Sequence, residues 1–125
     1  MKNLVYITFL LISISFYGQD KTCSDFKTGK FKYANPKYAE WEVTRNDSIQ
    51  IETNTKTGIK IYNTIVWNSD CNYVLTPKKV KNAKAKNYID KVFYVQIIKT
   101  LNDRYFCILK NNAIEDIQLE MVIVE

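Results

Sequence analysis

Apolar side chains recur at every second position over residues 58–75, and this stretch organises the rest of the chain. The spacing places them on one face of an extended strand. Asn68, Ser69 and Asp70 interrupt the pattern with residue types that suit a tight turn. The stretch therefore predicts a β-hairpin and, with it, an antiparallel β-protein. The apolar positions are Ile59, Ile61, Ile65, Trp67, Cys71, Tyr73 and Leu75.

Two residues, a polar Asn63 and a rigid Pro77, interrupt the alternating pattern of the hairpin. Asn63 interrupts the first arm, which leaves open either a β-bulge at Asn63 or a switch of the buried face to Tyr62 and Val66. Pro77 is expected to end the second arm, because proline has no N–H for a strand ladder. A short helical turn around residues 83–88 is the only regular structure expected over residues 76–90.

Alternation of the same kind predicts further strands on both sides of the hairpin. In the stretch after Asn46-Asp47, Ile49 and Ile51 are expected to point inward and Gln50 and Glu52 outward. About eight short strands with polar turns favour one all-β domain, an up-and-down meander closed or partly closed into a barrel, or failing that a sandwich. The additional predicted strands are residues 26–33, 41–45, 48–53, 92–101, 104–110 and 117–124.

The N-terminus has the pattern of a secretory signal peptide. Lys2 precedes the uncharged apolar run LVYITFLLISISF, which is too short for a membrane span. We expect residues 1–18 to be removed and residues 19–125 to form a single exported domain, periplasmic or secreted. This cleavage removes one lysine and no acid, so the net charge falls from +5 to about +4.

Three cysteines follow this leader: Cys23, Cys71 and Cys107. An odd number allows one disulfide with one free thiol, or an intermolecular bridge. Cys23 and Cys71 lie near predicted strand ends, where a bridge is geometrically easy, so we predict a Cys23–Cys71 disulfide. Cys107 lies in mid-strand among apolar neighbours, which predicts a buried, unreactive thiol.

The composition argues against catalysis and against cofactors. The chain has no histidine, which removes the usual triads and imidazole acid–base chemistry and makes a zinc site improbable. Only Gly29 and Gly58 remain after the leader, so no glycine-rich phosphate loop exists. We expect a non-catalytic protein with no metal and no cofactor.

Several aromatic residues allow two interpretations. They can stack on a sugar or line a small apolar cavity, or they can fill the core, and filling the core is the favoured interpretation. Arg45 ends a predicted strand, where it is either a ligand contact at the barrel mouth or, as we favour, an exposed or paired side chain. The aromatic residues concerned are Phe31, Trp41, Trp67, Tyr73, Tyr94 and Tyr105.

Two surface features are candidates for other roles. Asp47-Ser48-Ile49 matches a short pattern for bacterial O-glycosylation at Ser48. A lysine-rich segment without acids is expected on the surface, as a solvated loop or as a weak contact to an anionic envelope surface; nucleic acid is not an expected partner. Its lysines are Lys78, Lys79, Lys81, Lys84 and Lys86.

Several segments spread along the chain carry a resemblance to small exported proteins of Flavobacterium-type Bacteroidetes, a resemblance that implies export and no particular activity. The segments are Cys23-x-x-Phe26-x-x-Gly29-x-Phe31, Arg45, Gln50-Ile51-Glu52, Val66-Trp67 and Asp70-Cys71-x-Tyr73-x-Leu75-Thr76-Pro77. Gly29-Lys30-Phe31 also resembles the Gly-x-Trp that opens lipocalin-type barrels, with Phe in place of Trp. This likeness implies a barrel that binds a small ligand.

Two hypotheses on function follow from different classes. The first is an exported barrel that binds a small apolar or sugar-like ligand, or an envelope component. The second is an envelope interaction protein that uses its basic surface and has no ligand cavity. A hollow interior with a few convergent polar groups favours the first hypothesis.

Overall fold

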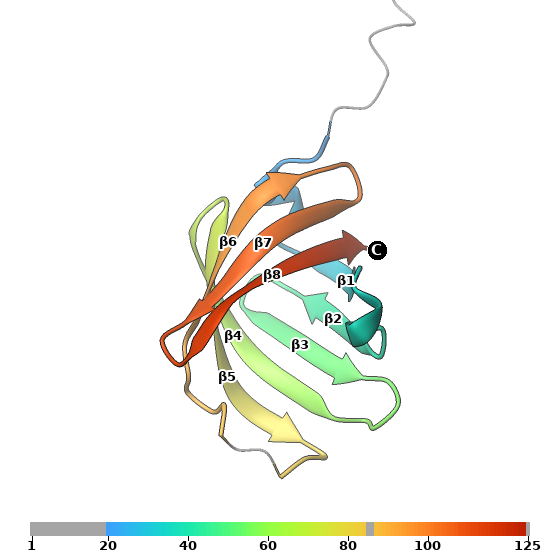
Figure 1. Ribbon diagram of the computed structural model, residues 1–125, viewed down its shortest axis with the longest axis vertical. Helices are drawn as coiled ribbons and strands as arrows, with labels where there is room; N and C mark the ends of the chain where they lie inside the picture. The colour runs from blue at the N-terminus through green and yellow to red at the C-terminus, as the bar shows by residue number, and fades with distance from the viewer. Residues whose placement is uncertain (1–19, 85–86, 125) are drawn as a thin grey trace, which may run out of the picture.

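Eight antiparallel strands form a closed barrel in sequence order (Figure 1). The computed structural model describes residues 20–84 and 87–124. Each strand pairs with the next, and β8 closes the barrel by pairing with β1. The predicted all-β, up-and-down barrel is confirmed, whereas the predicted leader lies outside the described residues. The strands are β1 (Gly29–Tyr33), β2 (Trp41–Arg45), β3 (Ile49–Asn54), β4 (Lys60–Ser69), β5 (Asn72–Lys81), β6 (Phe93–Thr100), β7 (Arg104–Asn111) and β8 (Ile114–Ile123).

A short 3₁₀ helix, η2 (Cys23–Phe26), precedes β1, although Phe26 was expected in the first strand. Local hydrogen bonds favour the helix, because the Thr22 N–H donates to the Asp25 carboxylate at 2.8 Å. The turn directs Phe26 into the barrel, where its ring is fully buried and lies 5.3 Å from that of Tyr105. We call the end of the barrel that η2 covers the plugged end.

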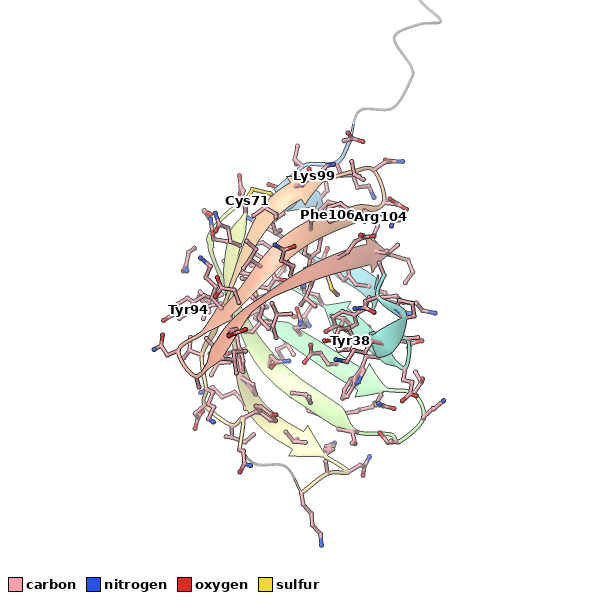
Figure 2. All side chains as sticks on the ribbon, in the orientation of Figure 1. Tyr38, Cys71, Tyr94, Lys99, Arg104 and Phe106 are labelled. Carbon is pink, nitrogen blue, oxygen red and sulfur yellow. A yellow bond between two sulfur atoms is a disulfide. The ribbon has the colours of Figure 1, made fainter. Side chains whose placement is uncertain are left out.

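The predicted disulfide is confirmed: Cys23 is bonded to Cys71, with the two Cα atoms 5.2 Å apart. Cys71 lies in the tight turn between β4 and β5, at the upper left in Figure 2. The bond therefore ties η2 to the central hairpin across a separation of 48 residues.

The central hairpin is longer than expected, because β5 continues through Pro77 to Lys81. The ladder between β4 and β5 shifts register at this point, with Tyr62 opposite Lys79 and Asn63 opposite Pro77. This irregularity accommodates a residue that cannot donate to the ladder. Of the two arrangements left open, the bulge is confirmed in part: the register shifts beside Asn63, but the extra residue is Lys78 in β5, and β4 itself keeps its alternation.

The alternative switch of the buried face is wrong. Val66 is 57% exposed, and Asn63 is buried on the same face of β4 as Ile65.

The inward and outward faces of β3 are the reverse of those predicted. Gln50 and Asn54 are buried, whereas Ile49 is 41% exposed. Glu52 shares the inward face with Gln50 because side chains alternate along a strand. An inward polar face is unusual in so small a barrel, and it forms part of the site described next.

Candidate functional site: a cavity with a polar floor

The barrel encloses a cavity of about 360 Å³. Its wall is mainly apolar and is built from inward residues of β4 to β8, so the prediction that bulky side chains fill the interior is wrong for this part of the barrel. Prominent wall residues are Ile61, Leu75, Val95, Leu109, Leu119 and Met121.

The cavity extends to the end of the barrel opposite η2. Pairing between β5 and β6 covers only Asn72–Gln96 to Leu75–Phe93, although β5 runs on to Lys81. Pro77 and Val80, on this continuation of β5, both line the cavity. We call this the cavity end; in Figure 1, β5 descends to it and the connection to β6 leaves from it.

Arg45 lies at the boundary between the cavity and the plugged end, buried to 5% exposure. Its Nε donates to Gln50 Oε1 at 2.9 Å, and its Nη1 donates to the Phe26 carbonyl at 2.8 Å. Its Nη2 donates to the hydroxyl oxygens of Tyr73 and Tyr105, at 3.2 and 2.8 Å. All of these partners are neutral. Arg45 is therefore neither exposed nor at the barrel mouth; of the favoured alternatives, it is a side chain paired through hydrogen bonds.

Aromatic rings surround the same guanidinium. Its carbon atom lies 4.6 Å from the ring centre of Phe31 and 4.8 Å from that of Tyr73. The ring centres of Tyr105 and Trp67 are 5.7 and 5.9 Å away. Contacts of a cation with aromatic rings are favourable, and more so away from water. Hydrogen bonds and rings together hold Arg45 in one position.

Glu52 forms a second polar group on the floor of the cavity. Its carboxylate accepts hydrogen bonds from the Tyr33 hydroxyl at 3.0 Å and from Asn63 Nδ2 at 3.4 Å. Burial raises the pKa of Glu52, against the lowering effects of these bonds and of the Arg45 cation. Burial and the neighbouring Glu52 raise the pKa of Tyr33 well above its ordinary value. Tyr33 therefore stays protonated and acts as a donor to Glu52.

Cys107 is the free thiol, as predicted, and is buried on the cavity wall. Burial raises its pKa to about 12, although the Arg45 cation acts in the opposite direction. A thiol with so high a pKa is a poor nucleophile at neutral pH.

The predicted aromatic residues divide between the two ends. Trp41 and Tyr73 line the cavity. Phe31 and Tyr105 are almost fully buried towards the plugged end, so the core interpretation holds for them. Tyr94 is 52% exposed and points away from the barrel in Figure 2.

Trp67 packs on Tyr73 with a ring separation of 4.6 Å. Its indole N–H is buried without a hydrogen-bond acceptor among the described residues.

The surface candidates stay separate from the cavity floor. Ser48 is exposed in the turn between β2 and β3, and its glycosylation stays a prediction. Lys78 pairs with Asp90 at 2.8 Å, and the Lys81 ammonium lies 5.4 Å from the ring centre of Tyr62. Lys79 and Lys84 are also exposed, whereas Lys86 lies outside the described residues.

Sequence reasoning missed Gln50, Glu52, Asn63 and Tyr33 as parts of a site. One signal was present: Gln50, Glu52 and Asn54 alternate in a strand that a short turn joins to the strand of Arg45. A row of polar residues beside a buried arginine indicates an inward polar face.

No family model matches the chain, and neither a curated protein nor a solved structure matches it. Function must be argued from the geometry. Among the described residues, no helix is both long and apolar enough to cross a membrane. Within residues 20–84 and 87–124, no cluster of acidic and cysteine side chains is arranged to hold a metal ion.

Proposed function

We propose that this protein is an exported, non-catalytic barrel that binds a small, largely apolar ligand in its interior. The observation that carries the proposal is the cavity of about 360 Å³ with apolar walls and a polar floor. Ligand pockets in proteins typically measure about 300–1,000 Å³ and combine apolar walls with a few polar groups that orient the ligand. At ~30 Å³ per water molecule, the volume corresponds to a ligand of roughly 12 non-hydrogen atoms.

Export is the second part of the proposal. It is supported by the signal-peptide pattern of residues 1–18 and by the resemblance to small exported proteins of Bacteroidetes. The Cys23–Cys71 disulfide is compatible with it, since such bonds persist in oxidising compartments.

The envelope interaction hypothesis has less support. It required a filled interior, and the barrel contains a cavity. Lys78, one of its basic residues, already pairs with Asp90.

Binding of 1-naphthylamine, a small neutral dye close in size to the ligand estimated above whose fluorescence changes on transfer from water, tests the proposal. We expect saturable binding of one dye per protein. Leu109→Trp fills the cavity and should abolish binding, because Leu109 lies on its wall. Val66→Trp adds the same ring on the outer surface and should leave binding unchanged.

Both variants must unfold cooperatively for the comparison to count. Absence of binding to the original protein, or equal binding by the two variants, would contradict an interior binding site.

A further inference from the structure

The floor of the cavity carries more hydrogen-bond donors than acceptors. Gln50 is buried to 3% exposure, and its Oε1 is identified as the oxygen because it accepts from Arg45. Its amide Nε2 therefore faces the cavity region with two N–H groups, and no acceptor for them lies among the described residues. Such a donor is an unmet hydrogen-bonding group in a site that water or a ligand must satisfy.

Arg45 and the tyrosine pair add to this excess. One N–H on Arg45 Nη1 has no acceptor among the described residues beyond the bond to Phe26. The hydroxyls of Tyr73 and Tyr105 lie 2.9 Å apart and both accept from Arg45. Only one of the two hydroxyl hydrogens is used between them. Tyr73, Arg45 and Gln50 all line the cavity, so these donors meet at one place.

Arg45 supplies a positive charge at this place. Arg45 has only neutral hydrogen-bond partners, and no carboxylate among the described residues forms an ion pair with it. A buried cation of this kind is stabilised by an anion that also accepts hydrogen bonds. Glu52 is the opposing group on the same floor, and it is engaged by Tyr33 and Asn63.

The cavity end is basic as well. Lys60 and Lys81 face each other across β4 and β5, next to Ile61 and Val80 of the cavity wall. Both lysines are exposed. Positive charge around the entrance of a cavity raises the local concentration of anions and their association rate.

We propose, on the basis of the binding function above, that the ligand is an amphiphile with an anionic headgroup. The headgroup, of the carboxylate type, lies against Gln50, Arg45 and Tyr73, and the apolar body extends along the wall towards the cavity end. The headgroup then accepts hydrogen bonds from the donors of the floor, and the apolar wall buries the hydrocarbon body of the ligand. A neutral or cationic headgroup leaves the Arg45 charge and the Gln50 amide without an acceptor of opposite charge.

Three ligands of equal length test this assignment: decanoate, decan-1-ol and decylamine, each of roughly 12 non-hydrogen atoms, which suits the cavity volume. They are measured by displacement of 1-naphthylamine and by calorimetry at neutral pH. We expect decanoate to bind at least about tenfold more tightly than decanol, and decylamine to bind most weakly.

Two variants of matched size locate the headgroup. Gln50→Glu keeps the oxygen that Arg45 requires, but replaces the donor amide with a second negatively charged oxygen, and should remove the preference for decanoate over decanol. Glu52→Gln removes the opposing charge and should increase that preference. Gln96→Glu is the control: it makes the same Gln-to-Glu substitution on the exposed face of β6 and should leave the preference for decanoate unchanged. Circular dichroism and cooperative unfolding establish that each variant is folded.

The outcomes separate this inference from the proposed function. The anionic assignment is overturned, and the binding function remains, if the dye binds but the three ligands bind with equal affinity. The same conclusion follows if the dye binds and decylamine binds most tightly, or if none of the three ligands binds. A preference for decanoate that survives Gln50→Glu also overturns the placement of the headgroup. Failure of the dye itself to bind removes the binding function, and the inference with it.

Discussion

The two ends of this barrel use the same strands in opposite ways. At the plugged end, η2 and the disulfide cover an interior of aromatic rings packed around Arg45. At the cavity end, β5 extends beyond its pairing with β6, and apolar side chains face empty volume. Phe31 and Phe93 illustrate the contrast, since the first is 1% exposed and the second is only partly buried.

The contrast shows how a small barrel can be both stable and hollow. Each void in a core costs packing energy, so the structure needs compensating contacts elsewhere. Here the fully buried large side chains Phe26, Phe31 and Tyr105 are concentrated towards the plugged end. The cavity end can then remain free for a ligand.

The largest expected effect comes from removing one ring at each end. Phe31→Ala should lower the free energy of unfolding by about 3–5 kcal/mol, because it opens a void in a closely packed cluster. Phe93→Ala should lower it by only about 1–2 kcal/mol, because its ring is half-buried and already borders the cavity. Urea unfolding of the two variants measures both values. Equal losses would mean that the two ends do not differ in packing.

A smaller effect is expected from the cross-link that holds η2 in place. The double variant Cys23→Ala with Cys71→Ala should lose roughly 2–4 kcal/mol, since the bond closes a loop with a separation of 48 residues. Cys107→Ala is the matched control without a cross-link and should lose about 1 kcal/mol through packing alone. Thermal and urea unfolding under non-reducing conditions give both values. A double variant no less stable than the control would show that the plug does not depend on the bond.

Most strands could be predicted from the sequence, because period-two alternation depends only on which residues face water. β2 was predicted at its observed bounds, and the hairpin was predicted with a turn at Asn68-Ser69-Asp70, whereas the observed turn is at Asp70 and Cys71. The disulfide followed from the positions of Cys23 and Cys71 relative to strand ends. Each of these predictions needed only the local pattern of residues around the positions concerned.

The polar floor could not be predicted in the same way. Alternation in β3 gives two faces, and the usual rule places Ile49 rather than Gln50 inside. The choice is reversed here because Arg45 requires polar partners, and Tyr73 and Tyr105 reach it from 28 and 60 residues away. Only the closed topology brings these residues together. Pro77 was misjudged for a related reason, since the bulge beside it at Lys78 depends on how β4 and β5 pair.

The smallest expected effect concerns Glu52, which lies where the two ends meet. Its pKa is raised in the folded protein, mainly by burial. The folded state therefore holds the proton to higher pH than the unfolded chain does, and stability falls as the pH rises from about 4.3, the ordinary glutamate value, through the raised pKa. Glu52→Gln stays neutral and keeps an acceptor for Tyr33, so it should unfold at a higher temperature than the original protein at neutral pH, and at a similar temperature below pH ~4. Glu115→Gln makes the same change on an exposed side chain and should follow the original profile. Melting temperatures measured across this pH range decide the matter: a Glu52→Gln protein that is less stable at neutral pH would mean that the ionised carboxylate supports Arg45 rather than costing stability.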